Sequence, residues 1–347
     1  MSGVRRRTFI AAALMTALPI QALAADSGAV LQLRLVTDEA EAVLRILDAR
    51  TAGVPTDADW AAVFASEGYT RLVAREASLH RPIDEISFRA FAMSDALLRR
   101  REALRDVLQR WSHADVTECG RRALAYLPPG SRMRAAVYPE IKPQGNSFVF
   151  DLEHDPGIFL YLDPKVGETE FTYTVAHELH HVGFAQNCPT PAVKREIAAL
   201  PPRLKLFESW LGGFGEGFAV LAGAGGPSVN PATVVSASAT GEWATERETF
   251  ASRIDALTTF FRAILNGQLK HDDATKAGMT FFGNQGPWYT VGWRMAITIE
   301  FNLGRTRLVD CIADNRRFLP TYNNIAARSG LPLWPNDVAH AFGLTGT

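Results

Sequence analysis

Residues 173–184 read Tyr173-Thr174-Val175-Ala176-His177-Glu178-Leu179-His180-His181-Val182-Gly183-Phe184, and this stretch is the most informative part of the chain. Its apolar residues Val175, Leu179 and Val182 recur at the spacing of one helix face, which predicts a helix. His177 and His181 are four residues apart, so on a helix their imidazoles are neighbours on one face. The stretch is therefore predicted to be an amphipathic helix that presents two imidazoles together.

The pattern H-E-x-x-H suits metal-dependent hydrolysis. Two adjacent imidazoles can bind one tetrahedral zinc ion. Glu178 is turned about 100° from His177, so it lies beside the metal, where a general base for a water molecule is needed. His180 also has helical spacing to His177. We favour His181 as the ligand because Glu178 then flanks the metal pair, and we expect His180 to support the site or lie on the surface.

A third protein ligand is needed, because a catalytic zinc site keeps its fourth position for water. Two carboxylates downstream are candidates: Glu208, within Phe-Glu-Ser-Trp, and Glu216, within Gly-Glu-Gly-Phe-Ala. The chain here resembles the gluzincins, zinc peptidases whose third ligand is a glutamate on a following helix. It is most similar to families of that clan with H-E-x-H-H followed by E-G-x-A. The resemblance favours Glu216, whose small neighbours Gly217 and Ala219 would let its helix approach the active-site helix.

The resemblance covers approximately residues 147–322 and implies a zinc-dependent hydrolase acting on peptides or proteins. It also implies an oxyanion donor on a later helix, for which Tyr289, with Arg294 behind it, is our candidate, although an aromatic residue at this spacing also suits a core. Two other readings stay open. One is hydrolysis of a non-protein amide such as a cell-wall peptide link, and the other is a non-catalytic zinc-binding protein of the periplasm.

The rest of the chain predicts an α+β fold, mostly helical, with a zincin-like core. Helical periodicity dominates residues 25–128, including one long helix from Asp84 to Leu108, and a breaker at Pro128-Pro129-Gly130 ends this region. Strand-like runs follow at 134–138, 147–152 and 157–162, so a small sheet within residues 131–163 should precede the active-site helix. The run 157–162 suits either a sheet edge that pairs with an extended peptide or an ordinary buried strand. Residues 129–347 form the predicted catalytic region.

Composition narrows the range of partners. The net charge of the chain is −1, and without the three arginines of the leader 33 basic residues face 37 acidic ones, a balance of −4. No strongly basic field exists to attract phosphates, so no nucleic-acid partner is expected. The three cysteines, Cys119, Cys188 and Cys311, allow at most one disulfide. Cys188 is expected to be a small buried thiol and not a metal ligand.

The first 24 residues have the order of a secretory signal peptide. Arg5-Arg6-Arg7 precede an apolar run from Phe9 to Leu18, and small residues at 22 and 24 suit a signal peptidase. Arg6-Arg7 followed by Phe9 also resembles the twin-arginine export motif. The apolar stretch is interrupted and shorter than the roughly 20 residues that a membrane span needs. We therefore expect an exported protein, periplasmic or secreted, with no stable membrane insertion after cleavage.

Cleavage after Ala24 should give a mature chain that begins at Ala25. Mass spectrometry of the protein recovered from the exported fraction measures this directly. Recovery of the intact N-terminus in the membrane fraction would instead establish an anchor.

Overall fold

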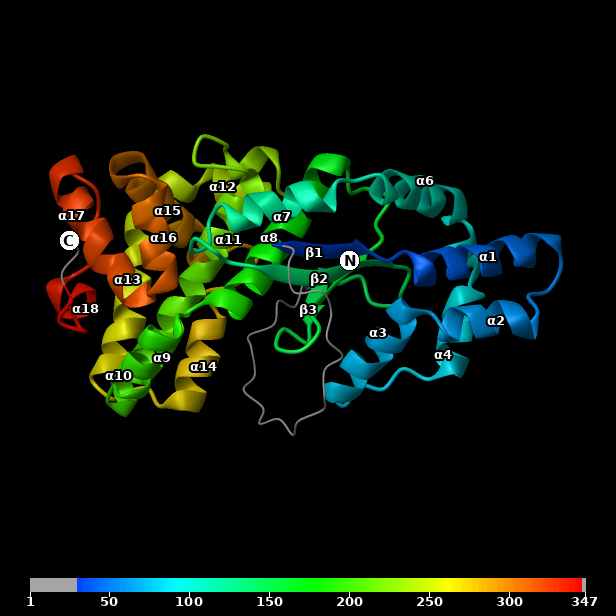
Figure 1. The fold of residues 1–347 in the computed structure, drawn as a ribbon, viewed down its shortest axis with the longest axis horizontal. Helices are drawn as coiled ribbons and strands as arrows, with labels where there is room; N and C mark the ends of the chain where they lie inside the picture. Colours follow the sequence, from blue (N-terminus) through cyan, green and yellow to red (C-terminus); the bar gives the residue numbers. More distant parts are fainter. Residues whose placement is uncertain (1–29, 345–347) are drawn as a thin grey trace. The chain divides into compact units, whose positions relative to one another are not determined.

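The computed structural model describes residues 30–344, and the predicted signal peptide lies outside this range (Figure 1). The described chain forms two compact units. The first contains residues Gln32–Thr117 and Arg134–Val175, and the second contains Glu118–Met133 and the residues from Ala176 onward. The predicted division into residues 25–128 and 129–347 stays a prediction.

The first unit combines helices with a small sheet, whereas the second is helical. The helices that begin in the first unit are α1 (Asp38–Ala52), α2 (Asp57–Phe64), α3 (Glu67–Ser78), α4 (Glu85–Ala92), α5 (Asp95–Leu98), α6 (Arg101–Ser112), α7 (Val116–Leu124) and α8 (Glu168–Asn187). The strands are β1 (Leu31–Leu35), β2 (Met133–Glu140), β3 (Phe148–Phe150) and β4 (Gly157–Tyr161). The predicted class, mostly helical α+β with a small sheet, is confirmed.

The sheet has the strand order β1-β2-β4-β3, with β4 parallel to β2 and antiparallel to β3. Strand β4 is therefore internal, so the buried-strand alternative for residues 157–162 is confirmed and the sheet-edge alternative is wrong. Its side chains are buried in the core: Ile158 and Phe159 have no exposed surface. Tyr138, Phe148 and Phe159 stack in the core of this unit.

The prediction of one long helix from Asp84 to Leu108 is also wrong. Asp84 caps α4 as expected, since its side chain accepts a hydrogen bond from the Ser87 amide, but α4 ends at Ala92. The side chain of Ser94 then caps a new helix, α5, by accepting from the Leu97 amide. Serine competes for backbone hydrogen bonds and so starts helices more readily than it continues them.

The second unit is built from helices around a buried pair. They are α9 (Pro191–Ala198), α10 (Pro202–Leu211), α11 (Gly215–Ala224), α12 (Thr240–Ala244), α13 (Glu246–Leu265), α14 (His271–Met279), α15 (Pro287–Leu303), α16 (Arg305–Ala313), α17 (Phe318–Ser329) and α18 (Asn336–Ala339). Short 3₁₀ turns lie at Gly212–Phe214, Pro231–Thr233 and Asn315–Arg317. Helix α11 is almost entirely buried and packs against α15, which is buried along Trp288–Ile299 except at Arg294.

None of the helices formed by residues 30–344 has the length and apolar character required to cross a bilayer.

Two carboxylates are buried together in the first unit. Glu39 on α1 accepts a hydrogen bond from the Ile141 amide at 2.9 Å. Glu140 at the end of β2 has no exposed surface, and neither of its carboxylate oxygens has a hydrogen-bond partner among the described residues. Burial raises the pKa of Glu39 to about 8 and the pKa of Glu140 well above its ordinary value. The folded unit therefore favours the protonated carboxyls.

Because both carboxyls are buried, we predict that their ionisation at high pH lowers the stability of the folded protein. A carboxyl whose pKa is raised by folding stabilises the folded state fully below pH 4.5, and that contribution is lost as the pH rises toward the folded pKa. Glu140→Gln removes the titration, so we expect its melting temperature to exceed that of the wild type by about 5 °C at pH 8. At pH 5 the two proteins should melt together, as measured by scanning calorimetry.

Glu153→Gln is the matched control, because Glu153 is exposed. A Glu140→Gln protein that melts below the wild type at pH 8 would show that the ionised carboxylate is stabilising.

Candidate metal centre

Helix α8 carries the predicted motif. Glu168 and Glu170 lie in its first turn, where negative charge stabilises a helix N-terminus. Val175, Leu179 and Val182 are completely buried, which confirms the predicted apolar face. His177 is buried, and the His181 side chain retains 26% of its surface. The two imidazoles therefore share one face of the helix, with His181 nearer the solvent.

Helix α11 brings a carboxylate to the same place. Glu216 is the only charged residue in α11, whose sequence is otherwise glycine, alanine and larger apolar side chains. A lone carboxylate on such a helix would be costly to bury without partners. It lies in the first turn, where the helix dipole favours negative charge.

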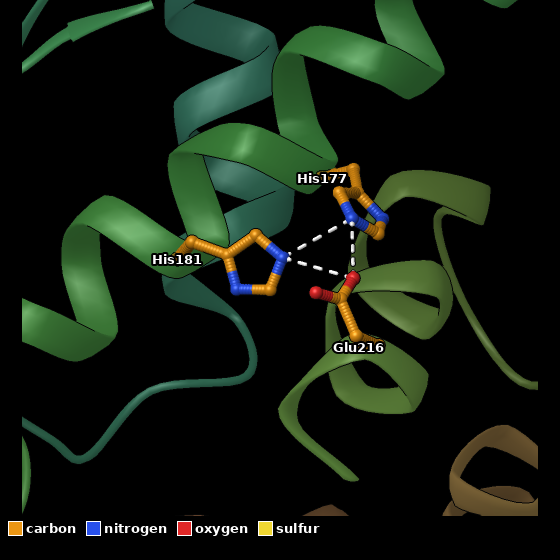
Figure 2. A group of neighbouring side chains, drawn as sticks. All are labelled: His177, His181 and Glu216. Carbon is orange, nitrogen blue, oxygen red and sulfur yellow. Dashed lines mark hydrogen bonds and ion pairs between the residues drawn. The ribbon is translucent and has the colours of Figure 1, made fainter. Parts of the chain in front are cut away.

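The three side chains converge on one point (Figure 2). The Oε2 atom of Glu216 is 3.2 Å from Nε2 of His177 and 3.3 Å from Nε2 of His181, and the two Nε2 atoms are 3.1 Å apart. Ligands about 2.0–2.1 Å from a tetrahedral zinc lie about 3.3 Å from one another. The spacing of these atoms thus fits three ligands of one zinc ion.

The charges of the centre reinforce one another. Burial opposes a charge on His181, but the nearby Glu216 carboxylate overcomes this effect and raises the pKa of His181 to about 9. Burial likewise opposes the Glu216 carboxylate, yet His181 and His177 hold its pKa below its usual range. Glu216 is therefore a buried anion that His181, when protonated, or a bound cation can neutralise.

Glu178 and His180 occupy different positions around this centre. Glu178 is buried, and its negative charge contributes to the raised pKa of His181. The Nε2 of His180 lies 3.3 Å from the carbonyl oxygen of Tyr126, to which it can donate. Burial lowers the pKa of His180 to about 3. Among the described residues, the group that could hold a metal contains His181 and not His180.

Tyr289 lies beside the centre. Its ring on α15 stacks on the imidazole of His177, with 6.2 Å between ring centroids and 11° between ring planes, and it is completely buried. Arg294, one turn further along α15, pairs with the buried carboxylate of Glu246 at 2.8 Å. The stacking places Tyr289 next to the motif, while its role as oxyanion donor stays a prediction.

The other candidate ligands lie apart from this group. Glu208, on α10, is not one of the three residues whose ligand atoms meet, and it lines a separate cavity. Cys188 is buried and forms no disulfide, and Cys119 and Cys311 are buried as well. Burial raises the pKa of the Cys188 thiol to about 12, which makes a thiolate ligand unfavourable.

A close approach of two helices holds Glu216 in position. A Cβ atom at Gly217 would lie 2.2 Å from the Trp293 amide nitrogen and 2.3 Å from the Gly292 carbonyl carbon. The small residue at 217 is thus required by α15, and not by the active-site helix as the sequence suggested. Sequence reasoning missed Gly292, although the Tyr-Thr-Val-Gly order of α15 places it one turn beyond Tyr289.

Two imidazoles and one carboxylate form a donor set that could hold a single zinc ion. The family model of DUF5700, described as "Putative zinc dependent peptidase", matches residues 60–330. The chain belongs to this family, and zinc is its cofactor. No curated protein and no solved structure matches the chain.

The helix crossing yields a prediction about the metal. Gly217→Ala places a methyl group against backbone atoms, which cannot move aside as a side chain would. We expect α11 to shift, with a loss of about 1–3 kcal/mol of stability. Zinc binding should weaken at least about tenfold, because mutating residues that position metal ligands typically lowers metal affinity by about 10–100-fold. Thermal unfolding and zinc content after dialysis measure the two effects.

Gly215→Ala is the control on the other side of Glu216. A Cβ atom at Gly215 would meet nothing within 4 Å, so this variant should bind zinc as the wild type does. Equal zinc affinity in the two variants would contradict the proposed packing constraint.

Proposed function

We propose that this chain is an exported zinc peptidase of the gluzincin type. In this proposal His177, His181 and Glu216 bind zinc, and Glu178 is the general base. The observation that carries the proposal is the meeting of three ligand atoms 3.1–3.3 Å apart on α8 and α11. A glutamate on a helix after the motif is the third ligand that defines the gluzincins, and the family description supports action on peptide bonds.

Zinc, when bound, polarises the carbonyl and lowers the pKa of water. The remaining chemistry falls to side chains of the chain itself. Glu178 follows His177 directly and is turned about 100° from it, so its carboxylate can accept a proton from the attacking water. It can then deliver this proton to the leaving amine. Because Glu178 is buried, its carboxylate is shielded from bulk water.

Tyr289 is proposed to stabilise the oxyanion that forms when water attacks the carbonyl. Support comes from its position against His177 on a helix that α11 contacts directly. A phenol can donate one hydrogen bond to such an oxyanion, and loss of one donor of this kind typically costs about 10²–10³ in kcat.

Export is part of the proposal and rests on the N-terminal sequence. The order of charged, apolar and small residues before Ala25 is that of a signal peptide. The mature chain would then act on peptides outside the cytoplasm.

Glu178→Gln tests the mechanism most directly. Glutamine keeps the size of the side chain but cannot accept the proton, so kcat should fall by about 10²–10⁴. KM should change little, because the loss is confined to the transition state. Zinc content should stay at one ion per chain, measured on the same sample as cleavage of a broad peptide library.

Two matched variants separate catalysis from metal binding. Glu216→Gln should lose zinc on dialysis, whereas Glu208→Gln should retain it; the reverse result would move the third ligand to Glu208. Tyr289→Phe, assayed with them, should lower kcat and keep zinc if Tyr289 is the donor. A zinc-loaded wild-type protein that cleaves no amide would favour the non-catalytic reading.

A further inference from the structure

A cavity of about 180 Å³ in the second unit is lined by residues that include Phe184 of α8 and Gly212, which precedes α11. Phe184, which lines it, follows His181 by three residues, so the two side chains lie on neighbouring parts of the α8 surface. Gly212, also in the lining, precedes Glu216 by four residues. The cavity is thus within about one helical turn of two of the three candidate ligands.

The cavity suits one side chain and not a whole ligand. Pockets for drug-sized molecules measure about 300–1,000 Å³, and this cavity is smaller. Consecutive Cα atoms of a peptide are about 3.8 Å apart, so the residue next to a scissile bond can reach a cavity one turn from the metal. Its rim includes Ser209 and Gly212, which are exposed, so the cavity is open to solvent.

The walls are mostly apolar, and Glu208, Ser209 and Asn315 are their polar members. Phe184, Pro189, Ile197, Ile312 and Ala313 supply the apolar lining. Long basic side chains combine an apolar stem with a charged head, and such walls match the stem.

Glu208 in this lining has no hydrogen bond or ion pair with any other described residue. The neighbouring guanidinium of Arg316 does not neutralise it, because Arg316 already pairs with Asp314 at 2.7 Å and with Glu196 at 2.6 Å. Three carboxylates, those of Glu208, Asp314 and Glu196, lie near two guanidinium groups, those of Arg316 and Arg317. When all are ionised, one negative charge is left unbalanced. The cavity therefore has an unbalanced carboxylate at an apolar wall.

We infer that Glu208 selects a basic residue, arginine or lysine, next to the scissile bond of the peptide substrate. The inference rests on the proposed peptidase function and names its substrate class. An apolar side chain would leave the carboxylate unpaired, and an acidic one would be repelled. A metal ion is a poor alternative occupant, since Glu208 belongs to no group of three or more metal-ligating side chains among the described residues.

The ionisation of Glu208 agrees with this assignment. Burial raises the pKa of Glu208 to about 7, with Arg316 lowering it and Asp314 raising it. A cation in the cavity requires the ionised carboxylate. Preference for a basic residue should therefore increase as the pH rises from 6 to 8, whereas cleavage of a neutral peptide should lack this component.

The test uses fluorogenic peptides that differ only beside the scissile bond, with arginine, lysine, norleucine or glutamate there. The zinc-loaded wild type should cleave the arginine or lysine peptide with at least about tenfold higher kcat/KM than the norleucine peptide. Glu208→Gln should reduce this preference by about 10- to 100-fold, the fold-change that corresponds to a charged hydrogen bond. Glu208→Lys should favour the glutamate peptide.

Glu248→Gln is the matched control, because Glu248 is exposed, lies on α13 and does not line the cavity. It should keep the basic preference. Cleavage without basic preference, or a preference that Glu208→Gln leaves intact, would overturn the inference while the peptidase function stands.

If no peptide is cleaved, a binding measurement tests the role of Glu208 instead. Calorimetry with N-acetyl-arginine amide and N-acetyl-norleucine amide tests the cavity without any hydrolysis. Tighter binding of the arginine compound to the wild type than to Glu208→Gln would support the assignment. Equal binding by the two proteins would refute it.

Discussion

The rest of the centre depends on the burial of one carboxylate, Glu216, in an apolar helix. Removing a carboxylate from water is unfavourable unless partners of opposite charge replace the solvent. His177 and His181 face it at 3.2 and 3.3 Å, and the three atoms have the spacing of zinc ligands. A metal held by the three residues would satisfy the charge of Glu216, the only charged residue of α11.

This carboxylate reaches the histidines because two glycines allow α11 and α15 to approach closely. Gly217 and Gly292 meet backbone to backbone, and a Cβ atom at Gly217 would lie only 2.5 Å from the Gly292 Cα atom. The same crossing brings Tyr289, on α15, against His177. A single packing constraint therefore positions a candidate metal ligand and a candidate oxyanion donor together.

Glu208 and Glu216 show how environment separates two identical side chains. Both lie on helices after the motif, and both are partly or largely buried. Histidines surround one and lower its pKa, whereas apolar walls surround the other and raise its pKa to about 7. One carboxylate is therefore suited to bind a metal, and the other is suited to bind a cation that enters from outside.

Features of the fold and the site that depend on local spacing could be predicted from the sequence alone. His177 and His181 share a face because they are four residues apart, and the strand runs and the helical class follow from short-range patterns. The family resemblance already favoured Glu216 over Glu208, and the structure brings Glu216 together with the two histidines. The position of β4 inside the sheet could not be predicted from the sequence. These outcomes depend on which distant segments pack together, and that packing is set by contacts such as Gly217 with Gly292, which no local periodicity encodes.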